Sequence, residues 1–169
     1  MAKINDHEAF VSAKPKFVPA DTNLAWIFNI QSNTWTPLPN TLEKRSGPSC
    51  GYFQTDSGRF VVLAGGLFSS TTEIFNLDTE TWTRGPDIGT ELFGGSMVSV
   101  DGDELLLVGG YNGAALADIR RMDSSLSSWD IVGQLSTPRF NAVTMAAPIS
   151  LQCAISLIRI YLYKYAKYE

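Results

Sequence analysis

The sequence predicts an all-β fold made of repeated four-stranded antiparallel sheets, and three observations support this prediction. Tryptophan recurs at intervals of 47 residues, at Trp35, Trp82 and Trp129. Two short apolar runs each end in a glycine pair, Gly65-Gly66 and Gly109-Gly110. Turn-forming residues recur roughly every 8 to 12 residues, which is typical of short strands rather than of helices. Hydrophobic residues make up 44% of the 169 residues, so the chain can bury a core.

Each repeated unit is predicted to contain four short strands. The first is a modest apolar stretch such as 94–100, followed by a tight turn containing Asp101-Gly102 or, in the other unit, Asp56-Ser57-Gly58. Aspartate and glycine between apolar runs favour a hairpin, because glycine adopts positive φ without steric cost. The second strand is the continuous apolar run, 60–64 or 105–108, whose composition predicts burial on both faces. The third covers residues such as 72–76, and the fourth is centred on the tryptophan.

Two further positions keep the interval of 47 residues. Seven residues before each tryptophan, a large apolar residue precedes a polar one, and ten residues after it comes an arginine or leucine. The apolar–polar pairs are Phe28-Asn29, Phe75-Asn76 and Met122-Asp123, and the later positions are Arg45, Leu92 and Arg139. Between the two glycine pairs the interval is only 44 residues, so loops of variable length connect a fixed set of strands.

A four-stranded unit that repeats at this length is typical of the blades of a β-propeller. The repeated residues resemble those of the kelch family: a glycine pair after an apolar strand, an aromatic residue followed by Asn or Asp, a tryptophan, then an arginine-containing segment. Met122 replaces the usual aromatic residue and Leu92 replaces the arginine. The resemblance implies an incomplete kelch-type β-propeller, an open arc of four-stranded antiparallel blades.

The repeated residues are expected to have structural roles. One indole per unit predicts core packing of Trp35, Trp82 and Trp129 against a neighbouring blade. The glycine pairs are expected where backbones approach closely. Arg45 and Arg139 are expected to bind main-chain carbonyl groups, to which a guanidinium fork is well suited.

The repeat divides the chain into three parts. Residues 1–22 carry no repeat signal, residues 23–148 hold a half unit, two full units and another half, and residues 149–169 form an atypical apolar, tyrosine-rich tail. No glycine pair stands where one is due, near residues 18–21. Because four blades of this length need close to 190 residues, three explanations stay open: a fragment of a longer protein, a ring completed by oligomerisation, or an open arc covered by the tail. Exposed blade faces predict self-association.

The resemblance implies that the chain is a scaffold that binds another protein. The loops that differ between units, 67–71 and 111–118, are the candidate contact surfaces, and within them Tyr111 and Asn112 are the candidate contact residues. Two alternatives stay open: a structural fragment without a function of its own, and the remnant of a kelch-like enzyme such as a carbohydrate oxidase or a sialic-acid isomerase. Because no catalytic motif is present, we expect that the chain is not an enzyme.

Composition excludes several kinds of partner. With 13 basic and 17 acidic residues the net charge is −4, which argues against nucleic acid as a partner. The single histidine, His7, argues against copper or zinc sites, and Cys50 and Cys153 lack metal-site spacing, so no cofactor is expected. The longest apolar stretch, 149–163, is too short to span a bilayer. Since neither a signal-peptide pattern nor a glycosylation sequon is visible, the expected location is the cytoplasm.

Overall fold

A computed structural model describes residues 1–12, 22–100, 104–146 and the backbone of 161–163. The expectations for the remaining residues lie outside the described part: the region near 18–21, the Asp101-Gly102 turn, Cys153 and most of the tail. Every described regular element is a β-strand, and twelve of the fourteen strands form three four-stranded antiparallel sheets. The predicted all-β class with four-stranded antiparallel sheets is therefore confirmed, and the arrangement fits a β-propeller in general terms.

The strands follow one another within each sheet in chain order. The first sheet contains β1 (Ala2–Lys3), β2 (Glu8–Ser12), β3 (Ala25–Asn29) and β4 (Thr34–Pro37). The second contains β5 (Ser49–Thr55), β6 (Gly58–Ala64), β7 (Thr72–Asn76) and β8 (Thr81–Arg84). The third contains β9 (Ser96–Val100), β10 (Glu104–Val108), β11 (Asp118–Met122) and β12 (Asp130–Gln134). β13 (Val143–Met145) pairs with β14 (Tyr161–Tyr163).

The N-terminal segment differs from its expectation. Residues 1–22 carry no repeat signal, yet they supply β1 and β2 and so complete the first sheet, in which Ala9 pairs with Phe28. β2 is harder to detect because its sequence, EAFVS, lacks the long apolar run of β6 and β10. Tertiary packing makes it a strand, since Phe10 is fully buried against the second sheet. The first unit is thus a full sheet rather than a half.

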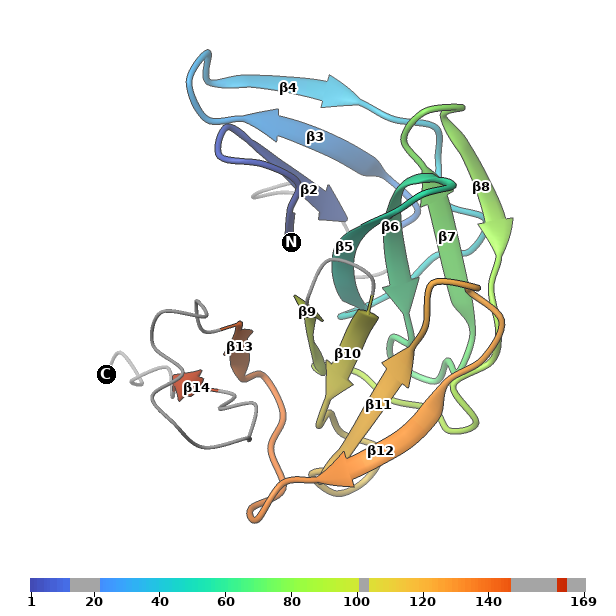
Figure 1. Cartoon of the computed structure of the whole chain (residues 1–169), viewed down its shortest axis with the longest axis vertical. Helices are drawn as coiled ribbons and strands as arrows, with labels where there is room; N and C mark the ends of the chain where they lie inside the picture. Colours follow the sequence, from blue (N-terminus) through green and yellow to red (C-terminus); the bar gives the residue numbers. More distant parts are fainter. Residues whose placement is uncertain (13–21, 101–103, 147–160, 164–169) are drawn as a thin grey trace.

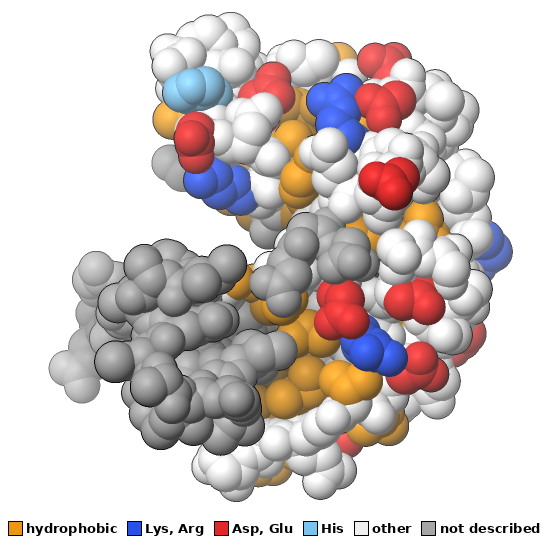
Figure 2. Space-filling model, in the orientation of Figure 1, with side chains coloured by type: hydrophobic (Ala, Val, Ile, Leu, Met, Phe, Trp, Pro, Cys, Tyr) orange, Lys and Arg blue, Asp and Glu red, His pale blue; other side chains and the backbone are white. Residues whose placement is uncertain are grey.

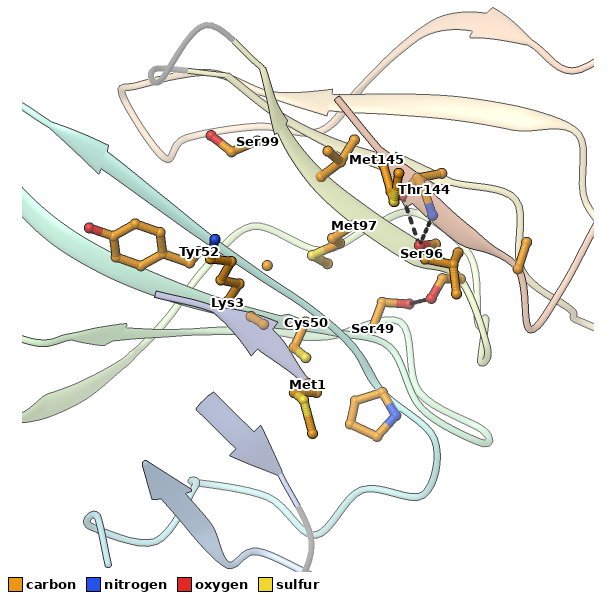
Figure 3. A pocket seen from close by; sticks show the side chains of 17 residues that line it. Met1, Lys3, Ser49, Cys50, Tyr52, Ser96, Met97, Ser99, Thr144 and Met145 are labelled. Carbon is orange, nitrogen blue, oxygen red and sulfur yellow. Dashed lines mark hydrogen bonds between the residues drawn. The ribbon is translucent and has the colours of Figure 1, made fainter. Parts of the chain in front are cut away.

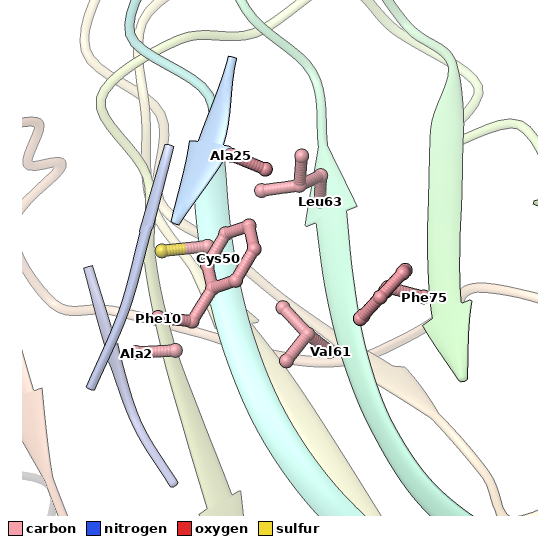
Figure 4. Close-up of a cluster of buried hydrophobic side chains, with 7 residues drawn as sticks. All are labelled: Ala2, Phe10, Ala25, Cys50, Val61, Leu63 and Phe75. Carbon is pink, nitrogen blue, oxygen red and sulfur yellow. The ribbon is translucent and has the colours of Figure 1, made fainter. Parts of the chain in front are cut away.

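The sheets stand side by side along a curved arc, with the N-terminal sheet at one end and β13 and β14 at the other (Figure 1). Each junction between sheets is filled by apolar side chains from both neighbours. Figure 4 shows the first junction, where Phe10 and Ala25 of the first sheet meet Val61, Leu63 and Phe75 of the second. We call the face of a sheet that points to the preceding sheet its leading face, and the opposite face its trailing face.

The continuous apolar strands lie in the interior, and β6 has a neighbouring sheet on each side. In β6, residues Val61 to Ala64 are all fully buried. Val61 and Leu63 point to the first sheet, and Val62 points to the third, because side chains alternate along a strand. β10 has the same pattern, with Leu105 and Leu107 fully buried. An unbroken apolar run is stable as a strand only where both faces are covered.

The tryptophans of the second and third sheets join the leading face of their sheet to the unit before it. Trp82 stacks on Phe75 with ring centroids 4.8 Å apart, meets Phe10 edge-on, and donates from its indole N–H to the carbonyl oxygen of Pro39 at 2.8 Å. Trp129 similarly donates to the hydroxyl of Thr72 in the second sheet, at 3.0 Å.

The prediction of core packing is wrong for Trp35. It stacks on Phe28 as Trp82 does on Phe75, with centroids 4.5 Å apart, but its side chain remains 39% exposed. The physical reason is that no sheet among the described residues lies against the leading face of the first sheet. The residue has the local geometry of the repeat without the neighbour that would bury it.

The polar residue after each large apolar residue ends the third strand. The side-chain oxygen of Asn76 accepts hydrogen bonds from the backbone N–H groups of Asp78 and Thr79, at 2.8 and 3.0 Å. Asn29 and Asp123 accept corresponding bonds from Ser32 and Ser125. Asparagine and aspartate are favoured here because their short side chains bond to the backbone of a turn.

The glycine pairs lie where one unit meets the connection to the next. Gly65 and Gly66 have φ values of 70° and 124°, and Gly109 and Gly110 repeat them at 64° and 116°. The N–H of Gly66 donates to the carbonyl oxygen of Leu92, and the N–H of Gly110 donates to that of Arg139, both at 2.8 Å. In the first unit Thr22 pairs with Arg45 in the same manner. Thr22, Gly66 and Gly110 are 44 residues apart, so the series continues where the glycine signal is missing.

We predict that Gly65→Ala destabilises the fold more than Gly89→Ala. Both glycines have positive φ, 70° and 83°, so both variants carry a backbone cost of roughly 1–2 kcal/mol. A Cβ atom on Gly65 also collides with the carbonyl oxygen of Leu92, whereas one on Gly89 meets nothing within 4 Å. Urea denaturation should show a larger decrease in the free energy of unfolding for Gly65→Ala than for Gly89→Ala. Equal decreases would show that the close approach of Leu92 O to Gly65 does not contribute to stability.

Candidate interaction surface

Three connections meet at one end of the sheets and form a groove of about 310 Å³. They are the β6–β7 loop, the β8–β9 connection and the β10–β11 loop. Each contributes three consecutive residues to the groove: 66–68, 91–93 and 111–113. The groove therefore contains Leu67 from one predicted contact loop, and Tyr111 and Asn112 from the other. We call this groove and the aromatic residues beside it the loop surface.

A row of aromatic rings crosses the loop surface. Tyr111 lies between Phe93 and Phe140, with ring centroids 5.4 and 5.1 Å away. The backbones of Phe93 and Tyr111 exchange two hydrogen bonds, of 3.1 and 2.9 Å, which fix the position of the row. Phe140 is 45% exposed, so the row extends to the solvent. Rigid aromatic rings that remain partly exposed are the side chains most often used to anchor a protein partner.

Phe68 is the most exposed aromatic residue of the loop surface, at 81%. Its φ of 61° lies in the left-handed region, which a bulky side chain seldom adopts. Both features cost free energy, because an apolar ring stays in water and the backbone is strained. Such a residue points to a functional role, and the adjacent Leu67, 46% exposed, extends the apolar patch.

A buried ion pair holds the loop that carries Phe68. Arg45 donates to the carbonyl oxygens of Gly65 and Thr71, at 2.7 and 3.0 Å, and thereby ties the two ends of this loop together. Its guanidinium also meets Glu73 Oε1 at 2.8 Å, and the Arg45 and Glu73 side chains are 1% and 0% exposed. Glu73 accepts backbone N–H groups of Leu42 and Glu43 as well, so both buried charges are satisfied.

The third sheet holds its own loop by different contacts. Leu92 and Arg120 occupy the places of Arg45 and Glu73 in the repeat register, so the ion pair is lost. Arg120 is 5% exposed and bonds to Asp118 at 2.8 Å, and its Nη1 has no acceptor among the described residues. The β10–β11 loop is positioned by the Phe93–Tyr111 backbone bridge and by a bond from Asn112 to Thr90, at 3.2 Å.

The outcome for Arg139 differs from that for Arg45. Its backbone continues the series of connections, because Arg139 N donates to Leu116 O and Arg139 O accepts from Gly110 N. Its side-chain Nε is buried and has no partner within the described part of the chain. The expected binding of carbonyl groups by both arginines is thus seen for Arg45 alone.

A second cavity, of about 540 Å³, lies on the concave side of the arc, where β1, β5, β9 and β13 line it (Figure 3). Three of its hydroxyl groups bind to one another or to the backbone. Ser49 donates to Gly95 O at 2.9 Å, and the Ser96 and Thr144 hydroxyls are 2.8 Å apart. Cys50 is buried and free. Because the Ser49 and Ser96–Thr144 contacts join neighbouring inner strands and their flanking segments, we assign this cavity to the packing of these strands.

Sequence reasoning found part of the loop surface. It named Tyr111, Asn112 and the 67–71 loop, but not Phe93, Phe140 or Glu73. Phe93 and Phe140 could have been found, because each directly follows a repeat position and they are 47 residues apart. Glu73 carried a signal too: it is a lone charge in a strand whose other side chains are mostly buried.

Comparisons with known proteins give no family for this chain. No protein-family model matches the sequence, and no curated protein matches it. Within the described ranges, no group of three or more His, Cys, Asp or Glu side chains is placed to hold a metal ion. A search of the same ranges finds no helix of the length and apolar character needed to cross a membrane.

We predict that Glu73→Gln lowers the free energy of unfolding by about 3–5 kcal/mol, because it leaves the Arg45 charge buried without its main counter-ion. Asp78→Asn is the control, since the Arg59–Asp78 pair is 48% and 41% exposed and water screens it. Denaturation should show a large decrease in the free energy of unfolding for Glu73→Gln and little change for Asp78→Asn. Similar losses would contradict the assigned importance of the buried pair.

We also predict a pH dependence carried by Glu43. A hydrogen bond from Thr71 and another from Arg84 lower the pKa of Glu43 below its ordinary value of 4.5. A lowered pKa means that the ionised group stabilises the fold above the unfolded pKa, and that this contribution is lost as the pH falls through the folded value.

Unfolding midpoints measured from about pH 6 to pH 3 should therefore fall more steeply for the wild type than for Glu43→Gln. Glu80→Gln, on an exposed turn, serves as the control and should keep the wild-type slope. Parallel curves for the wild type and Glu43→Gln would refute the prediction.

Proposed function

We propose that the chain is part of a kelch-type β-propeller whose role is to bind another protein. Two features support the kelch type. The two glycine pairs share one backbone conformation, and the tryptophans of the second and third sheets each donate a hydrogen bond from the indole N–H to the preceding unit. Arg45 and the polar residue after each large apolar residue add the remaining positions of the kelch pattern.

The loop surface is the proposed binding site. The single observation that carries this proposal is the exposed aromatic patch, in which Phe68 is 81% exposed at a strained φ and borders a groove lined by Phe93 and Tyr111. The patch lies on loops, whereas the sheets that support them are rigid, and this division is common in binding proteins. Among the described residues that line the groove, Glu91 is the single acidic or basic side chain and the others are mostly apolar or aromatic, a composition that favours binding over catalysis.

The test is site-specific photo-crosslinking in cells. A photo-reactive phenylalanine analogue replaces Phe68 in one sample and Ser57, on the exposed β5–β6 turn, in the control. We expect a protein crosslinked from position 68 and not from position 57. The purified partner should then bind the wild type at least tenfold more tightly than a Phe68→Ser, Tyr111→Ala variant, since aromatic anchors dominate such interfaces.

Ile30→Ser is the matched binding control, because Ile30 is also exposed, at 58%, but lies outside the loop surface. This variant should bind as the wild type does. If no crosslinked protein depends on Phe68 and Tyr111, the proposal fails and the structural-fragment alternative is favoured.

A further inference from the structure

The groove of the loop surface contains one acidic side chain, Glu91, whose carboxylate has no partner among the described residues. Glu91 is exposed, and none of the described residues that line the groove is a lysine, arginine or histidine. Within the described ranges, the hydrogen bond to Glu91 reaches its backbone oxygen, from the hydroxyl of Thr90 at 3.4 Å. Asp87 on the same connection differs, because it accepts hydrogen bonds from Ser70 and from the N–H of Gly89, at 2.8 and 2.7 Å. The charge of Glu91 is therefore available to a ligand.

The other polar side chains of the groove add a second free acceptor. Asn112 donates from its amide nitrogen to the hydroxyl of Thr90, at 3.2 Å, so its amide oxygen is left to accept a hydrogen bond. A carboxylate such as that of Glu91 can accept hydrogen bonds but cannot donate them, and the hydroxyl of Tyr111 can do both. The groove thus suits a ligand that brings hydrogen-bond donors and a positive charge.

Aromatic rings border the same groove. Leu92 is 1% exposed and lies in the core, so the residues on either side of it, Glu91 and Phe93, point away from the core. Both line the groove together with Tyr111 and the exposed Phe68. The face of an aromatic ring attracts a cation, and the planar guanidinium of an arginine can stack on a ring while its N–H groups bind a carboxylate. Rings beside an unpaired carboxylate therefore favour arginine over lysine as the ligand's basic residue.

We propose that the loop surface recognises a segment of the partner protein in which an arginine stands beside an apolar residue. The arginine donates to the Glu91 carboxylate and the Asn112 amide oxygen, and its guanidinium stacks on the aromatic row. The apolar residue covers Leu67 and Phe68, which removes exposed apolar surface from water. This inference rests on the proposed function, because it names the chemistry of the segment that the loop surface binds.

The charge of the whole chain favours the same partner. The net charge is −4, and Figure 2 shows acidic side chains distributed over much of the face in view. A negative field attracts a basic segment over a distance and increases its rate of association. An acidic segment would instead be repelled, both by this field and by Glu91 within the groove.

The test begins with the selection of peptides on the purified full chain, from a phage-displayed library of short random peptides. Peptides are kept if they bind the wild type and do not bind the Phe68→Ser, Tyr111→Ala variant. We expect the kept peptides to be enriched in arginine next to an apolar residue, relative to the unselected library. Synthetic copies of these peptides are then the probes for titration.

Titration against charge variants tests the contact with Glu91. Glu91→Gln should raise the dissociation constant roughly fivefold, the upper range for an exposed ion pair. Glu91→Lys should raise it further, and should bind a peptide whose arginine is replaced by glutamate more tightly than the wild type does. Glu80→Gln is the matched control, because Glu80 is also exposed but lies on the β7–β8 turn, outside the loop surface. This variant should bind as the wild type does.

Two results would overturn the inference while leaving the proposed function in place: kept peptides without an excess of arginine, and equal affinities of the wild type and Glu91→Gln for the kept peptides. A library that yields no peptide dependent on Phe68 and Tyr111 would also overturn it, and the photo-crosslinking experiment then decides the proposed function by itself. Melting curves check that each variant is folded.

Discussion

Each of the three four-stranded sheets is apolar on both faces, and this constraint governs the rest of the structure. A strand such as β6, with four consecutive fully buried residues, cannot lie at the surface of an isolated sheet. It is stable only between two neighbours, so the sheets must stand face to face in a series. The series is stable where two sheets meet, and an apolar side chain stays exposed on a face that no described sheet covers, as Trp35 shows.

Backbone contacts between successive units determine how the sheets are spaced. Thr22, Gly66 and Gly110 each bond to the connection that follows their own sheet, at Arg45, Leu92 and Arg139. Glycine is needed where the backbone has positive φ and a carbonyl oxygen of the next connection fills the place of a Cβ. Since these bonds fix the framework, the loops beside them are free to differ in length and sequence.

The loop surface is formed by these loops, which can differ in length and sequence from one sheet to the next. In the second sheet the buried Arg45–Glu73 pair closes the loop and leaves Phe68 projecting into solvent. In the third sheet the ion pair is absent, and a backbone bridge between Phe93 and Tyr111 positions the loop. Two different solutions thus present aromatic side chains to one groove. The ion pair acts as a positioning device, and the exposed rings form the contact surface that we propose.

The sequence alone determined the strand class, the four-stranded unit and its repeat, because glycine pairs, turns and apolar runs act over a few residues. It also located the loops that carry Tyr111 and Asn112. Tertiary structure decided whether a residue is buried or exposed where this depends on a neighbour distant in the sequence. Phe10 joins the core through contact with the second sheet, Glu73 is buried because Arg45 reaches it, and Trp35 stays exposed because no described sheet covers it. Local pattern cannot specify these outcomes, since burial depends on which surfaces meet in space.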